Sequence, residues 1–168
     1  MKEIVRLFIL LFVFVMFVFF ITKFIKHNNS ITKRLGYIPN FSCKTLKNNT
    51  FTKDSLNNSL PKLFIYFNSE CEYCNEITKQ VSNSLELLDS LQVIFISSEK
   101  TEAIETFAMK HNLLHKKNIV FLMDFEMKFS KTIDAQTVPY MLIYNKDNSL
   151  KKNFKGSTTI SKVIMYLD

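Results

Sequence analysis

An uninterrupted apolar run near the N-terminus limits what the chain can fold into. Every residue from Leu7 to Ile21 is apolar (LFILLFVFVMFVFFI), and the run extends over residues 4–25 if Arg6 and Lys23 turn their charges towards lipid headgroups. A helix needs about 20 predominantly apolar residues to cross a bilayer. The run therefore predicts that residues 1–26 form a transmembrane anchor that contacts the lipid bilayer through residues 4–25.

A cleaved signal peptide is the alternative interpretation of this segment. Such peptides usually have a shorter apolar region that ends in small residues. Here residues 19–24 read FFITKF without an Ala-x-Ala pattern, and no cysteine directly follows the apolar run to carry a lipid. These features favour a retained anchor, followed by a polar stalk over residues 27–35.

Basic residues on both sides of the anchor bear on its orientation. Two precede the apolar run and four follow it within residues 23–34, so the positive-inside bias slightly opposes export of the C-terminal part. The position of the segment at the N-terminus favours export in the manner of a signal anchor. We expect an inner-membrane protein with one span and its soluble domain on the periplasmic face, chiefly because of the cysteine chemistry described below.

Composition and charge exclude several other classes of protein. A hydrophobic content of 47% is not that of a disordered chain, and 2 Gly leave no Gly-rich phosphate loop. With only 3 Cys in 168 residues, a disulfide-stapled mini-domain is excluded as well. The net charge of +7 is spread along the chain without a dense basic block, which indicates no nucleic acid and at most mild attraction to anionic headgroups.

Residues 36–168 predict an α/β domain. Short apolar runs predict strands, and apolar residues at helical spacing predict helices, the first of which begins near the cysteines. Residues 36–41 resemble a turn that leads into an edge strand carrying Cys43. The expected strands are 63–67, 92–97, 119–123, 140–145 and 150–154, and the expected helices are 76–88, 101–112, 125–133 and 160–167. Crossover helices give parallel strands and the KDNS turn gives a hairpin, so the sheet should be mixed and flanked by helices.

The pair Cys71 and Cys74 falls between a buried strand and a helix. A cysteine at a helix N-terminus lies near the positive end of the helix dipole, which stabilises a thiolate and lowers the thiol pKa. Two intervening residues let one sulfur reach the other. The spacing predicts dithiol exchange in which Cys71 is the nucleophile and Cys74 resolves the mixed disulfide. Glu70 and Glu72 flank the first cysteine and should oppose part of the pKa lowering.

Other interpretations of the cysteines remain open at this point. Half of a zinc site would need a second pair of ligands, but Cys43 stands alone and His111 and His115 lie beside two lysines. A structural disulfide across so short a loop would stabilise little. Cys43, in a predicted strand, is expected to be a buried and inert thiol.

Val138 and Pro139 precede the predicted strand at residues 140–145, where a proline fits at the start of a strand, in a cis turn or in an ordinary loop. Together with the cysteine pair, these residues make the chain resemble membrane-tethered thioredoxin-like proteins of the TlpA/redoxin group (AhpC/TSA type). The residues that carry the resemblance are IPNF (38–41), LFIYFNSECEYCNEI (63–77), TVPYMLIYNKDN (137–148) and Gly156, and it covers about residues 36–168.

The resemblance implies a thioredoxin-like fold and a particular site. Pro139 would be cis and packed against the sulfurs, the Val138 backbone would pair with a substrate strand, and Tyr73 would contact substrate where the family often has proline. Glu76 is the candidate proton acceptor, one position away from the usual acid. No metal and no cofactor are implied. The implied partners are protein disulfides or dithiols and a membrane electron donor of the thiol type.

Two further functions are alternatives to thiol–disulfide exchange. A redoxin-type peroxidase should have Thr three residues before the reactive cysteine, where this chain has Asn68. A copper-binding or scaffold module of the same fold would favour a wider cysteine spacing and a histidine in the C-terminal part, and residues 119–168 contain no histidine.

Overall fold

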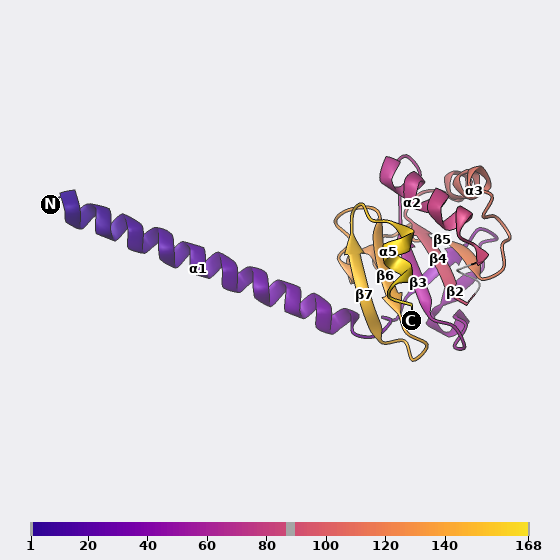
Figure 1. The fold of residues 1–168 in the computed structure, drawn as a ribbon, viewed down its shortest axis with the longest axis horizontal. Helices are drawn as coiled ribbons and strands as arrows, with labels where there is room; N and C mark the ends of the chain where they lie inside the picture. The colour runs from indigo at the N-terminus through magenta and orange to yellow at the C-terminus, as the bar shows by residue number, and fades with distance from the viewer. Residues whose placement is uncertain (1, 87–89, 168) are drawn as a thin grey trace. The chain divides into compact units, whose positions relative to one another are not determined.

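The computed structural model describes residues 2–86 and 90–167, which fall into two compact units, residues 1–34 and residues 35–168 (Figure 1). The first unit contains helix α1 (Lys2–Leu35) except for Leu35, the last residue of the helix. The second unit begins at Leu35, whose side chain is fully buried.

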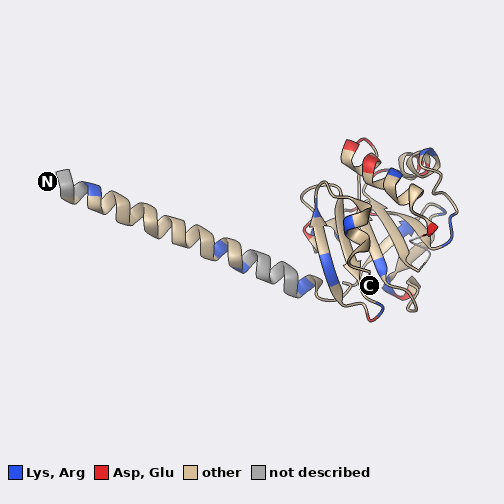
Figure 2. Cartoon of the chain, viewed as in Figure 1, with Lys and Arg blue, Asp and Glu red and all other residues tan. Residues whose placement is uncertain are grey.

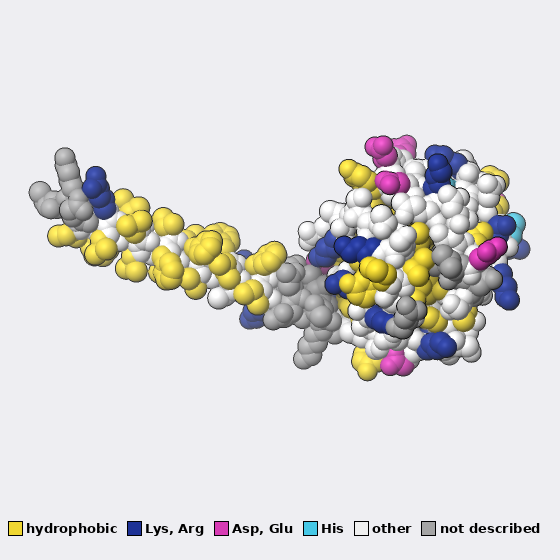
Figure 3. Space-filling view, viewed as in Figure 1, with side chains coloured by type: hydrophobic (Ala, Val, Ile, Leu, Met, Phe, Trp, Pro, Cys, Tyr) yellow, Lys and Arg dark blue, Asp and Glu magenta, His cyan; other side chains and the backbone are white. Residues whose placement is uncertain are grey.

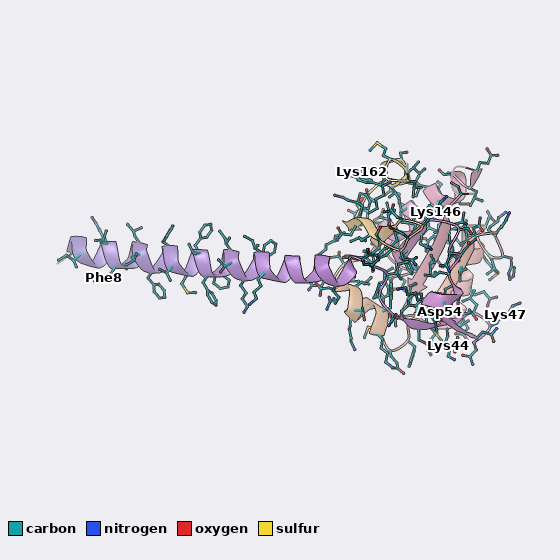
Figure 4. All side chains as sticks on the ribbon, turned by 90° about the horizontal axis from the view of Figure 1, so that it is seen from below. Phe8, Lys44, Lys47, Asp54, Lys146 and Lys162 are labelled. Atoms are coloured by element: carbon teal, nitrogen blue, oxygen red, sulfur yellow. The ribbon has the colours of Figure 1, made fainter. Side chains whose placement is uncertain are left out.

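Helix α1 is apolar on all sides between Arg6 and Lys26. This stretch of 21 residues is long and apolar enough to cross a membrane, and none of its side chains is buried. Its hydrophobic side chains cover the helix surface in Figure 3, and side chains such as Phe8 point outward in Figure 4. Lysine and arginine mark both ends of the apolar stretch in Figure 2. A signal sequence would fit the same description. The backbone of the predicted stalk, residues 27–35, continues the same helix.

The second unit contains a seven-stranded mixed sheet in the order β2-β1-β5-β4-β3-β6-β7. β3, β4 and β5 are parallel, and the other neighbours pair antiparallel. Helices α2 and α3 provide the two crossovers between the parallel strands. The strands are β1 (Ser42–Thr45), β2 (Thr50–Thr52), β3 (Lys62–Tyr66), β4 (Gln92–Ser97), β5 (Ile119–Met123), β6 (Tyr140–Tyr144) and β7 (Leu150–Lys155).

Two apolar layers cover the sheet. Helices α2 (Glu72–Asn83), α3 (Thr101–Lys110) and α5 (Ile160–Ile164) pack on one face, where their buried residues join those of β3 to β7 in one core cluster. The other face carries α4 (Lys128–Ile133), whose Phe129 ring stacks on Phe64 of β3 with ring centroids 5.6 Å apart. The predicted α/β domain with a mixed sheet flanked by helices is confirmed.

The start of the second unit is fixed to the turn between β6 and β7. The amide of Ile38 donates to the Asn148 carbonyl at 3.0 Å, and the amide of Leu150 donates to the Gly36 carbonyl at 2.8 Å. Lys62, fully buried at the start of β3, donates its ammonium protons to Asn148 Oδ1 at 2.8 Å and to the Lys146 carbonyl at 3.2 Å. The chain therefore enters the domain at the sheet end that holds the first residue of β3.

Several element boundaries differ from those predicted. The helix expected at residues 76–88 begins at Glu72 and ends at Asn83, and Leu88 lies outside the described residues. The earlier start follows from Cys71, which takes an extended conformation as the N-cap and leaves the whole cysteine pair on the first turn. Strand β2 was not predicted, because its three residues TFT are too few to show an alternating pattern.

Candidate active site: a dithiol at the end of strand β3

The loop after β3 sets the position of Cys71. The Asn68 side chain accepts the Glu70 amide proton at 3.0 Å, and its carbonyl accepts the Cys71 amide proton at 3.2 Å, so the loop turns sharply into α2. Cys71 then caps the helix, and Cys74 lies one turn further along. Both cysteines carry free thiols. The strand-to-helix placement predicted for this pair is confirmed.

The two thiols have different surroundings. Cys71 is partly exposed and its Sγ donates to the Val138 carbonyl at 3.7 Å, whereas Cys74 is fully buried. The pKa of Cys74 is raised to about 12, chiefly by burial and to a smaller extent by hydrogen bonding and charge interaction with Cys71 and by the charge of Glu99. A hydrogen bond from the Asn68 backbone opposes part of this rise. At neutral pH the buried sulfur is therefore a thiol.

The Val138–Pro139 segment lies at the same sheet end as the dithiol. Its peptide bond is cis, as the resemblance implied. β6 pairs antiparallel with β3, with Tyr140 opposite Tyr66, so the residue before β6 meets the loop that follows β3. The Pro139 carbonyl accepts the Gly156 amide proton at 2.9 Å, which ties this segment to the end of β7. The structure thus brings Val138, and with it Pro139, to Cys71.

A carboxylate that the sequence did not single out lies near the dithiol. Glu99 accepts hydrogen bonds from the Ser69 amide at 2.7 Å, the Ser69 hydroxyl at 2.5 Å and the Ser97 hydroxyl at 2.9 Å. Its charge also contributes to the raised pKa of Cys74. Glu99 follows β4 directly, and the carboxyl ends of adjacent parallel strands meet at one sheet edge, so this rule could have pointed to it.

The predicted acidic and aromatic residues of the motif lie on the surface. Glu76, the candidate proton acceptor, is exposed on α2, as is Glu72, and Glu70 is exposed in the loop before the helix. Tyr73 exposes 55% of its surface beside the cysteines. Of the described carboxylates, the one whose charge acts on the pKa of Cys74 is therefore Glu99 rather than Glu76.

Cys43 is separate from the dithiol. It is buried in β1, and burial together with the charge of Asp124 raises its pKa to about 12, as expected for an inert thiol. It lines a cavity of about 680 Å³ between the β1–β5 edge and α4, whose lining includes none of the six predicted site residues. Within residues 2–86 and 90–167 no group of three or more His, Cys, Asp or Glu side chains is arranged to hold a metal ion.

A model of the AhpC/TSA family matches residues 36–163, which is most of the second unit. The chain belongs to the AhpC/TSA family. The match coincides with the region over which the resemblance was seen, so the redoxin assignment made from the sequence is confirmed. A search of curated protein sequences finds no match.

Solved structures show the same fold at low sequence identity. A secreted Mycobacterium tuberculosis disulfide oxidoreductase, homologous to Escherichia coli DsbE, aligns with a TM-score of 0.65 and 18% identity over 80% of this chain and 96% of its own. StoA from Bacillus subtilis aligns with a TM-score of 0.62 and 16% identity over 79% and 99%. The peroxidoxin BcpB from M. tuberculosis gives 0.68 and 9% over 78% and 93%. The family domain is therefore thioredoxin-like, as the resemblance implied.

Proposed function

We propose that the protein is a membrane-anchored thiol–disulfide oxidoreductase that works through Cys71 and Cys74. Family membership indicates oxidoreductase or peroxidase activity in general. The observation that favours disulfide exchange is the pairing of a partly exposed thiol at a helix N-terminus with a fully buried thiol one turn later. One sulfur is open to a substrate, and the other is reserved for attack on the first.

The reaction balances as two thiol–disulfide exchanges. The Cys71 thiolate attacks one sulfur of a client disulfide, the client S–S bond breaks, and the departing client sulfur takes up a proton. Cys74 then gives its proton to a nearby carboxylate and attacks Cys71 Sγ, which releases the second client thiol. The client gains two electrons, and the protein becomes the Cys71–Cys74 disulfide. A membrane donor of the thiol class would return it to the dithiol form, and the chain needs no cofactor.

Other residues of the site receive supporting roles in this proposal. The Val138 backbone, next to Cys71 Sγ, would pair with an extended client segment, with Pro139 beside it and exposed Tyr73 in contact with the client. Glu99 is better placed than Glu76 to accept the Cys74 proton, because its charge already acts on that thiol.

Cysteine variants test the proposal. Cys74→Ser should trap mixed disulfides with client proteins, whereas Cys71→Ser should trap none, as seen on non-reducing gels after acid quenching. The parent protein should reduce insulin. Equal trapping by both variants would overturn the assigned roles. Consumption of hydrogen peroxide without insulin reduction would favour the peroxidase, which the likeness to BcpB keeps as the second candidate.

We also propose that residues 1–26 remain as an anchor in the inner membrane, with the domain on the periplasmic face. The support is the span at Arg6–Lys26 and the oxidising compartment in which dithiol exchange of this kind is used. A reporter that is active only outside the cytoplasm, fused after Asp168, should be active. Activity of a cytoplasmic reporter at the same position would reverse the orientation.

A further inference from the structure

The segments at the two ends of helix α3 both contact the loop that precedes the dithiol. Glu99, two residues before α3 begins, accepts the amide and hydroxyl protons of Ser69. Lys110 and His111, at the C-terminal end of α3, reach the same loop through the side chain of Asn75. Because Asn75 immediately follows Cys74 on α2, its amide joins the two helices beside the cysteines.

Both polar atoms of the Asn75 side-chain amide form hydrogen bonds. Its Nδ2 donates to the Ser69 carbonyl at 2.8 Å and to the Cys71 carbonyl at 3.0 Å. Its Oδ1 accepts from Lys110 Nζ at 2.8 Å and lies 3.1 Å from His111 Nε2. An amide oxygen accepts only, so this arrangement assigns the Nε2–H tautomer to His111.

His111 is held in place as a neutral donor. Only 9% of its surface is exposed, its ring centroid lies 4.7 Å from that of Phe107, and its carbonyl accepts from the Ser82 hydroxyl at 2.8 Å. Burial and the charge of Lys110 lower the pKa of His111. The imidazole therefore stays uncharged at neutral pH and contributes a fixed N–H to Asn75.

We propose that Asn75 is a positioning residue that fixes Cys71 by clamping the 69–71 backbone to the C-terminal end of α3. The Ser69 carbonyl is held by Asn75 while its amide and hydroxyl are held by Glu99, so the loop is fixed from two sides. The Cys71 sulfur itself makes a long contact of 3.7 Å to Val138. The position of the Cys71 sulfur therefore depends on the backbone of residues 69–71.

The test measures the rate at which iodoacetamide alkylates Cys71 in the reduced full-length chain in detergent. Asn75→Ala should change this rate about fivefold, the effect of losing one or two net side-chain hydrogen bonds. Asn83→Ala is the matched control, since it changes the same residue type at an exposed position on the same helix and should keep the parent rate.

Two His111 variants separate positioning from packing. His111→Phe keeps the ring on Phe107 but removes the N–H, and should shift the rate in the same direction as Asn75→Ala by a smaller factor, because Lys110 still donates to Asn75 Oδ1. His111→Gln keeps an N–H donor but loses the ring, and should react like the parent. The double variant Asn75→Ala/His111→Phe should be no further from the parent than Asn75→Ala alone, because both changes act through one amide.

Three results would overturn the proposal: a parental rate for Asn75→Ala, additive effects in the double variant, or a larger effect of His111→Gln than of His111→Phe. The role of Asn75 in disulfide exchange rests on the proposed function. The alkylation test does not, because alkylation of Cys71 needs no disulfide substrate. A parent that fails to reduce insulin would contradict the proposed function, while the alkylation rates would still decide the role of Asn75.

Discussion

At the scale of single residues, the chemistry depends on how differently two thiols on one helical turn are solvated. Cys71 is partly exposed at the N-cap, and Cys74 is fully buried with a raised pKa. A buried thiol that must attack a neighbouring sulfur needs a base to take its proton. In the proposed mechanism this base is Glu99, whose charge acts on the pKa of Cys74.

We expect Glu99→Gln to slow the resolution of mixed disulfides by Cys74 about 100-fold, the lower range for loss of a general base. Glu76→Gln, on the exposed face of α2, should resolve them at the parent rate. Stopped-flow measurement of client release from a preformed Cys71 mixed disulfide would give both rates. A defect in Glu76→Gln with normal release by Glu99→Gln would restore Glu76 as the acceptor.

Cys43 provides a prediction about pH. Burial, with the charge of Asp124, raises its pKa from 9.0 to about 12, so the folded state favours the neutral thiol. Its contribution to stability is complete below about pH 9 and is lost as the pH rises towards 12, at about 1.4 kcal/mol per pH unit. Urea unfolding between pH 9.5 and 10.5 should therefore show a shallower decline for Cys43→Ala than for the parent. Parallel declines would contradict the assigned environment.

At the scale of elements, the sequence was most informative where strands are buried on both faces. The boundaries of β4 and β5 agree with those predicted, because β4 is the apolar run VIFI between Gln92 and Ser97 and β5 is the apolar run IVFLM. The position of Glu99 could not be derived in the same way. Its approach to Ser69 depends on the parallel register of β3 and β4, in which Tyr66 lies opposite Ile96, and no local pattern encodes that register.

The short helix α4 depends on one buried carboxylate. Asp124, 3% exposed, accepts the amide protons of Phe129 at 3.1 Å and Ser130 at 3.0 Å. Asp124→Ala should lower the free energy of unfolding by about 1–3 kcal/mol, because two amides of the first turn lose their acceptor. The exposed Asp54→Ala is the control and should change it by less than about 0.5 kcal/mol. Equal midpoints in urea for the two variants would contradict this role.

At the scale of the whole molecule, the compact second unit begins within the last turn of α1. Leu35 belongs to that unit and is fully buried, whereas Arg34 is exposed. We expect residues 30–168 to leave the membrane fraction and remain folded. In that shortened chain Leu35→Ala should lower the free energy of unfolding by about 2–4 kcal/mol, and Arg34→Ala should leave it unchanged. Denaturant titration of the two variants would measure the difference, and similar values would place the start of the core after Leu35.

The attachment of Gly36 and Ile38 to the β6–β7 turn bears on how an anchored dithiol of the proposed kind would meet its partners. The point where the chain enters the domain and the dithiol lie at opposite ends of β3, a strand of five residues that spans about 17 Å. The Cys71 sulfur therefore lies at the end of the sheet away from the point where the chain enters the domain. Under the proposed anchoring, the frequency with which this sulfur meets a partner in the same membrane corresponds to an effective concentration, which depends on the length of chain between the anchor and the domain. Shortening the segment of residues 27–34 should change that concentration and leave the intrinsic reactivity of Cys71 as it is.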